Sequence, residues 1–280
     1  MPTAGAVPQS VDRGNPRPAV VETHRLTRRF GALTAVDAVS LGVRGAEIIG
    51  LIGPNGAGKS TLIKMLTTML PPSSGGAVVA GFDLATQAAQ VRRHIGYVPQ
   101  LLSADSELTG YENLLLSARL YLIPRAERKQ RIGEALAMMG LTEVRERLVR
   151  NYSGGMIRRL EIAQSTLHRP AIIFMDEPTE GLDPVARHAV WSHIRDLRAR
   201  LAAAVIVTTH YMDEADVLCD RIALIDRGRI QAVGTPAALK AEAGANATLD
   251  DVFEKLTGLA PEGGDYRNVR QSRRAAREHT

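Results

Sequence analysis

Residues 53–61 read Gly53-Pro54-Asn55-Gly56-Ala57-Gly58-Lys59-Ser60-Thr61, a run with the spacing G-x-x-x-x-G-K-[ST]. Apolar residues precede the run at 48–52 and follow it at 62–66, which predicts a buried strand, a tight loop and a helix. Glycines let such a loop turn its backbone N–H groups toward an anion, and the positive end of the following helix strengthens the attraction. The run therefore predicts a phosphate-binding loop, in which Lys59 reaches the β and γ phosphates of a nucleotide and Ser60 is a ligand of Mg²⁺.

The chain has 280 residues, of which 45% are hydrophobic, enough for one large α/β domain or two smaller subdomains. Its single cysteine, Cys219, excludes an internal disulfide, and the N-terminal segment does not resemble a signal peptide; we therefore expect a reducing cytosolic setting. The longest apolar run of the second half, 201–207, is far shorter than the roughly 20 residues that cross a bilayer. A membrane role is expected to need a partner chain.

The net charge of +5 is concentrated at the two ends of the chain. Residues 265–280 carry a net +3 and residues 1–19 a net +1, which leaves +1 for the body. We expect both ends to be disordered, because short charged segments seldom fold by themselves. A lipid-binding or nucleic-acid-binding arm is the less favoured interpretation of the basic tail, and no nucleic acid is expected on the nearly neutral body.

Strand-like and helical patterns alternate along the chain, which favours a sheet with helices on its faces. Short apolar segments between residues 20 and 41 are typical of an antiparallel β meander. From 101 to 165 the periodicity is helical, which predicts a helical insert in the α/β body. The segment 236–260 is predicted as a C-terminal helical extension and 261–280 as a basic disordered tail.

Further candidate residues stand at the ends of predicted strands and helices. Asp176 and Glu177 end a second apolar run, where one carboxylate can hold Mg²⁺ and the next can polarise the water that attacks a phosphate. Ser153-Gly154-Gly155 stands 23 residues before Asp176 and begins a predicted helix, which offers another phosphate-binding N-terminus. His210 ends a further strand-like run, where a sensor of the γ phosphate is expected.

These motifs, in this order, resemble the ATP-binding subunit of ATP-binding cassette (ABC) transporters over residues 20–235. The resemblance implies an α/β P-loop NTPase fold of the ABC ATPase type, a mixed sheet core with an antiparallel β subdomain and the helical insert. It implies ATP and Mg²⁺ as cofactors. It assigns catalysis to Glu177, His210 and Lys59, and Mg²⁺ to Ser60, Gln100 and Asp176. The residues implied in ATP binding are Phe30, the loop 53–61, Gln100, Ser153, Gly154, Gly155 and Asp183.

The resemblance also implies partners. In this family the signature serine of one subunit completes the ATP site of another, so a head-to-tail homodimer or heterodimer is expected, bound to separate transmembrane permease subunits at the cytoplasmic face of the cell membrane. Tyr152, Met156 and Glu180 depart from the residues most frequent in the family. Met156 and the late segment 248–258 resemble the daunorubicin-resistance type of drug exporter, which implies export of a drug-like or amphiphilic compound.

Other functions stay open at this point. Export of a lipid or polysaccharide is the alternative within transport. A soluble ABC ATPase that acts on nucleic acid or ribosomes is the alternative outside transport, although such proteins usually carry two cassettes or a long coiled coil. A regulatory module that does not hydrolyse ATP is disfavoured, because Lys59 and Glu177 are both present.

Overall fold

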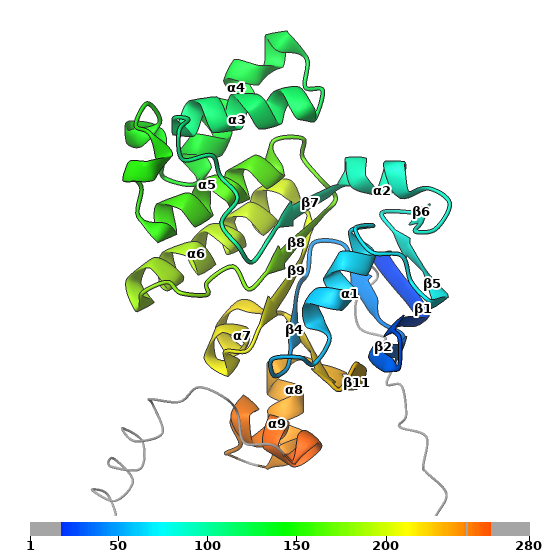
Figure 1. Cartoon of the computed structure of the whole chain (residues 1–280). Helices are drawn as coiled ribbons and strands as arrows, with labels where there is room; N and C mark the ends of the chain where they lie inside the picture. The colour runs from blue at the N-terminus through cyan, green and yellow to red at the C-terminus, as the bar shows by residue number, and fades with distance from the viewer. Residues whose placement is uncertain (1–17, 245, 259–280) are drawn as a thin grey trace, which may run out of the picture.

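The computed structural model describes residues 18–244 and 246–258, so the predictions for the basic tail and for most of the N-terminal segment lie outside the described residues. One sheet is antiparallel and has the strand order β2-β1-β5-β6, with β3 paired to β1 (Figure 1). Its strands are β1 (Ala19–Phe30), β2 (Leu33–Val39), β3 (Gly42–Arg44), β5 (Ser74–Val79) and β6 (Phe82–Asp83).

The second sheet has the order β11-β10-β4-β9-β8-β7 and is parallel except for the β10–β11 hairpin. Every residue of its central strands β4, β9 and β8 is buried, because both faces of the sheet are covered. Its strands are β4 (Ile48–Ile52), β7 (Ile95–Val98), β8 (Ile172–Asp176), β9 (Ala204–Thr209), β10 (Arg221–Asp226) and β11 (Arg229–Gly234).

The helices begin at recognisable caps. The side chains of Thr109, Ser153, Asp183 and Thr235 each accept a backbone N–H of the first turn of the helix that follows. The helices are α1 (Lys59–Leu66), α2 (Ala88–His94), α3 (Gly110–Leu120), α4 (Arg125–Met138), α5 (Gly154–Thr166), α6 (Pro184–Leu201), α7 (Met212–Leu218), α8 (Pro236–Ala243) and α9 (Leu249–Thr257), with short 3-10 turns at Thr142–Val144 and Val149–Asn151.

Two apolar cores lie on opposite faces of the parallel sheet, because successive side chains of a strand point to opposite sides. Ile48 and Ile52 of β4 join the core beneath α3 to α7, whereas Ile49 and Leu51 join the core beneath α1, α2 and the antiparallel sheet. In Figure 1, α3 and α4 lie at the end of the molecule opposite α8 and α9. The predicted fold class, a mixed sheet core with an antiparallel β sheet beside it, is confirmed.

Within the residues that the structure describes, no helix combines the length and the apolar character that a membrane crossing demands.

Candidate functional site

The loop between β4 and α1 is held so closely that two of its positions admit only glycine. Gly58 has φ +103°, and a Cβ atom there would collide with the backbone oxygen of Ala35 on β2. A Cβ atom on Gly53 would collide with the backbone oxygen of Ile225 on β10. The phosphate-loop pattern thus lies at the edge where the parallel strands end, between the two sheets.

Lys59 is the first residue of α1, and only 4% of its side chain is exposed. Its Nζ donates to the backbone oxygens of Gly53 at 2.7 Å and Pro54 at 3.1 Å, and it lies 3.4 Å from Oε1 of Glu177. Burial lowers the pKa of Lys59, while the neighbouring Glu177 opposes that shift. The loop therefore presents a buried cation whose charge is compensated by one carboxylate.

Asp176 ends β8 beside Thr208 of β9 in the sheet register. Ser60 Oγ donates to Oδ1 of Asp176 at 3.1 Å, and Thr208 Oγ1 donates to the same oxygen at 2.6 Å. Thr208 Oγ1 also accepts the backbone N–H of Glu177 at 2.8 Å. Thr208 is not among the residues predicted from the sequence. Its only signal there is a hydroxyl at the end of an apolar run, where a buried polar group needs a partner.

Glu177 follows β8 with φ +47°, a left-handed conformation that non-glycine residues seldom adopt and that often occurs at functional sites. Gln100 Nε2 donates to its Oε2 at 3.1 Å, and His210 Nδ1 lies 3.6 Å from its Oε1. The contact with His210 and the charge of Lys59 lower the pKa of Glu177 despite its burial. The carboxylate is therefore ionised at neutral pH.

His210 lies between two carboxylates. Besides its contact with Glu177, its Nε2 lies 3.5 Å from Oε2 of Glu180, one of the residues that depart from the family pattern. The contact with Glu177 is the main cause that raises the pKa of His210, and the charge of Glu180 adds to it. The predicted catalytic residues Lys59, Glu177 and His210 thus form one cluster.

The remaining predicted residues lie elsewhere and make local contacts. Ser153 Oγ accepts the N–H of Met156 at 3.3 Å, and Asp183 accepts two N–H groups at the start of α6. Phe30 is 45% exposed, and the guanidinium of Arg28 lies 4.6 Å from its ring centroid. Among the described contacts, no hydrogen bond or ion pair connects Ser153, Asp183 or Phe30 with the cluster around Glu177.

Tyr152, another departure from the family pattern, has a structural explanation. Its hydroxyl donates to the backbone oxygen of Val144 at 2.7 Å, and a Cβ atom on Gly110, the first residue of α3, would collide with it. Tyr152 is 7% exposed. The phenol thus fills the space beneath the start of α3 and joins three segments of the helical region.

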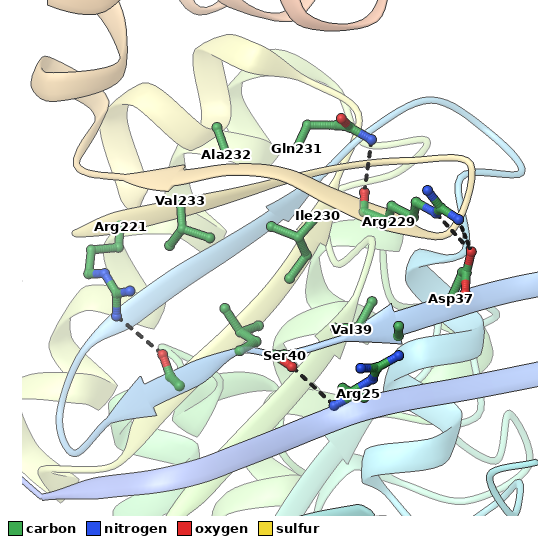
Figure 2. A pocket seen from close by; sticks show the side chains of 13 residues that line it. Arg25, Asp37, Val39, Ser40, Arg221, Arg229, Ile230, Gln231, Ala232 and Val233 are labelled. Carbon is green, nitrogen blue, oxygen red and sulfur yellow. Dashed lines mark hydrogen bonds and ion pairs between the residues drawn. The ribbon is translucent and has the colours of Figure 1, made fainter. Parts of the chain in front are cut away.

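A cavity of about 800 Å³ lies away from the cluster, between β2 and the β10–β11 hairpin (Figure 2). Three arginines line it: Arg25, Arg221 and Arg229. Arg229 is paired with Asp37 at 2.6 Å, and Arg221 with Glu47 at 3.1 Å. The cavity shares no residue with the cluster of Lys59, Glu177 and His210, so its size does not identify the reaction site.

Comparison with known proteins places these observations in a family. The family model described as "ABC transporter" matches residues 36–180. The chain is 45% identical over 226 residues to the daunorubicin/doxorubicin resistance ATP-binding protein DrrA of Streptomyces peucetius, covering 81% of this chain and 68% of that protein. It is 40% identical over 259 residues to the doxorubicin resistance ATP-binding protein DrrA of Mycobacterium tuberculosis, covering 89% and 78%.

A solved structure of an ATP-binding subunit of an ABC transporter is similar in fold, with a TM-score of 0.76 and 30% identity, covering 85% of this chain and 99% of that one.

Proposed function

The chain belongs to the ABC transporter family as an ATP-binding, ATP-hydrolysing subunit, and from this membership we propose that it drives the export of a drug-like or amphiphilic compound. The observation that carries the ATP-hydrolysis part of the proposal is the convergence of Lys59, Glu177 and His210 beside the phosphate loop. Relatives named for resistance to daunorubicin and doxorubicin support the class of compound.

Each residue of the cluster has a proposed role in hydrolysis. The N–H groups of the loop 53–61 and the ammonium of Lys59 hold the β and γ phosphates, because both offer positive charge at a water-poor site. Glu177 orients and polarises the attacking water, for which an ionised carboxylate is required. His210 reaches toward the γ phosphate, and its contacts with two carboxylates keep the imidazole in place. Phe30 stacks on the adenine ring.

The oxygen atoms of Ser60 and Asp176 suit Mg²⁺, which prefers oxygen ligands and near-octahedral geometry. The two lie 3.1 Å apart, so one cation can meet both. We propose that Ser60 and Asp176 hold Mg²⁺ together with Gln100, whose amide lies beside Glu177. The cation would neutralise part of the charge on the phosphate oxygens.

The subunit is proposed to act as a head-to-tail pair. Ser153 and the start of α5 would complete the ATP site on the phosphate loop of the second subunit, because a helix N-terminus attracts the γ phosphate, and Asp183 would lie at the same junction. We also propose that residues 20–235 form the ATPase domain with a helical subdomain at 101–165. The pair would bind permease subunits peripherally, at the cytoplasmic face of the cell membrane.

Replacing Glu177 tests the hydrolytic part of the proposal. Glu177→Gln keeps the size of the side chain and the contacts of Lys59 with the loop, but it removes the charge that orients the water. We expect nucleotide affinity within about threefold of wild type, turnover lowered by about 10²- to 10⁴-fold, and an ATP-dependent dimer. Binding of a fluorescent ATP analogue, phosphate release and light scattering measure the three quantities.

The matched control is Glu134→Gln, which removes an exposed carboxylate of α4 paired with Arg169. This variant should hydrolyse ATP at the wild-type rate. If Glu177→Gln hydrolyses ATP as fast as the control, the role proposed for Glu177 is wrong.

A further inference from the structure

The segment that joins β7 to the helical region is held by two charged residues of α5. Arg158 and Glu161 lie one turn apart on this helix and form an ion pair of 2.9 Å between Nη1 and Oε2. Their side chains are 3% and 2% exposed. Burial of an ion pair seldom adds much to stability by itself, because the desolvation of both groups offsets their attraction. The other partners of the pair therefore indicate what it does.

Arg158 binds two successive carbonyl groups of the segment. Its Nη1 donates to the backbone oxygen of Pro99 at 2.6 Å, and its Nη2 donates to that of Gln100 at 2.7 Å. A guanidinium can make both contacts at once, because its donors form a rigid planar fork. The backbone of Gln100 is thereby attached to α5.

Glu161 binds the same segment three residues further on. Its Oε1 accepts the backbone N–H of Ser103, the hydroxyl of Ser103 at 3.1 Å and the backbone N–H of Ala104 at 3.3 Å. The ion pair thus binds carbonyl groups at one end of the segment 99–104 and N–H groups at the other. This distribution fits an irregular segment, whose backbone groups lack the regular hydrogen bonds of a helix or a sheet and need side-chain partners instead.

The attached segment presents Gln100 to the reaction site. Its side-chain Nε2 donates to Glu177 at 3.1 Å while its carbonyl group is held by Arg158. Ser153 is the N-cap residue of α5 and precedes Arg158 by five residues. The same helix therefore carries the predicted signature serine at its start and the attachment of Gln100 on its second turn.

We propose that Arg158 and Glu161 are positioning residues that hold the backbone of 99–104 on α5 so that the side chain of Gln100 meets Glu177. The inference rests on the proposed function, because it takes Glu177 as the residue that orients water. A displacement of α5 then moves the backbone of Gln100 with it. The position of α5 therefore affects the contact between Gln100 and Glu177. Loss of the pair leaves the phosphate loop intact and releases Gln100.

The test replaces both charges at once by Arg158→Met with Glu161→Met, since removal of one partner would leave a buried charge unpaired. Hydrogen–deuterium exchange of the full chain should accelerate at least about tenfold in peptides covering 99–104, because the N–H groups of Ser103 and Ala104 lose their acceptor. Exchange of peptides covering 48–66 should stay unchanged. Turnover should fall about 10- to 100-fold, with nucleotide affinity within about threefold of wild type.

Arg159→Met is the matched control. Arg159 is the next residue of α5, and its Nη1 donates to the backbone oxygen of Met139 at 2.9 Å, within the helical region and not in the segment 99–104. This control should leave both the exchange of 99–104 and the turnover number close to wild type. If the double variant does not fold, Arg158→Lys serves as a milder variant. Its single ammonium should keep one of the two carbonyl contacts. Exchange of peptides covering 99–104 should then be faster than in wild type, but by less than the roughly tenfold expected for the double variant.

Unchanged exchange in 99–104 would overturn the proposal, and so would faster exchange with wild-type turnover. An equal effect of Arg159→Met would overturn it as well, because the loss would then belong to α5 as a whole. These results leave the proposed function standing if Glu177→Gln still abolishes hydrolysis. Failure of Glu177→Gln to do so would instead remove the premise, so the two failures are distinguishable.

Discussion

Glu214 is a carboxylate without exposed surface, and two of its three partners lie within two residues of the candidate catalytic residues Glu177 and His210. Its Oε1 accepts the hydroxyl of Thr179 and the indole N–H of Trp191, both at 2.8 Å, and its Oε2 accepts the hydroxyl of Thr209. Thr179 follows Glu177 by two residues, and Thr209 precedes His210. Glu214 thus joins the segment that follows Glu177 to the end of β9, next to His210.

Burial raises the pKa of Glu214 in the folded chain, although its three donors oppose the shift. The folded state then binds the proton of this group more tightly than the unfolded state does. Its contribution to stability is full below the unfolded pKa, about 4.3, and is lost as pH rises through the higher folded value. Glu214→Gln removes this titration but keeps a polar side chain of the same size.

We therefore expect the free energy of unfolding of wild type, minus that of Glu214→Gln, to decrease as pH rises from about 4 and then to level off. Urea denaturation of both chains at several pH values measures the difference, in which the other titrating groups cancel. A difference that is independent of pH, or that grows with pH, would contradict the raised pKa.

At the scale of elements, α9 shows how a short terminal helix is stabilised. Thr248 and Asp251 form a capping box at its start, and Gly258 ends it with φ +70°. Leu249, Val252 and Phe253 are buried, and the helix packs against α7 and α8. The packing therefore fixes α9 to the body that carries the candidate site.

Phe253→Ala should lower the free energy of unfolding by about 3–5 kcal/mol, because it removes a buried aromatic ring and leaves a cavity. The affinity for nucleotide should stay at the wild-type value, since Phe253 is not part of the cluster around Glu177. Leu256→Ala is the control on the same helix; Leu256 is 42% exposed, and its loss should cost no more than about 0.5 kcal/mol. Urea denaturation measures both free energies of unfolding. If Phe253→Ala and Leu256→Ala lower the free energy by equal amounts, α9 does not pack as described.

At the scale of the whole molecule, the proposed export function predicts a complex with a membrane protein. No helix among the described residues is suited to crossing a membrane, and the matched relatives are named as ATP-binding proteins of drug resistance. We propose that separate permease subunits supply the path for the exported compound.

We expect affinity capture of the tagged chain from detergent-solubilised native membranes to recover a membrane protein with several apolar spans. Mass spectrometry identifies the partner, and membranes carrying the tag without the chain give the background. Transport assays on the recovered pair would then separate drug-like compounds from lipids and polysaccharides. Recovery of ribosomal or DNA-bound proteins in place of a membrane protein would keep the ATPase and refute export.

Much of this protein could be predicted from the sequence. The phosphate loop is a contiguous run whose glycines, lysine and serine have a required spacing, and the apolar runs before and after it determine a buried strand and a helix. The alternation of strand and helix patterns predicts an α/β fold, and the resemblance of the motifs to a known family predicts the family. The roles of the individual site residues remain predictions, and the proposed variants test them.

The tertiary structure alone decided the contacts that hold these residues in place. Thr208 meets Asp176 across neighbouring strands, Glu180 meets His210 across two loops, and Arg158 meets Pro99 from a helix 59 positions further along the chain. Such contacts leave no periodic signal in the sequence, because their partners are distant in the chain and each side chain has an ordinary local role as well. They arise only when the parallel strands end at one edge and α5 packs beside β7, which brings unconnected segments within hydrogen-bonding distance.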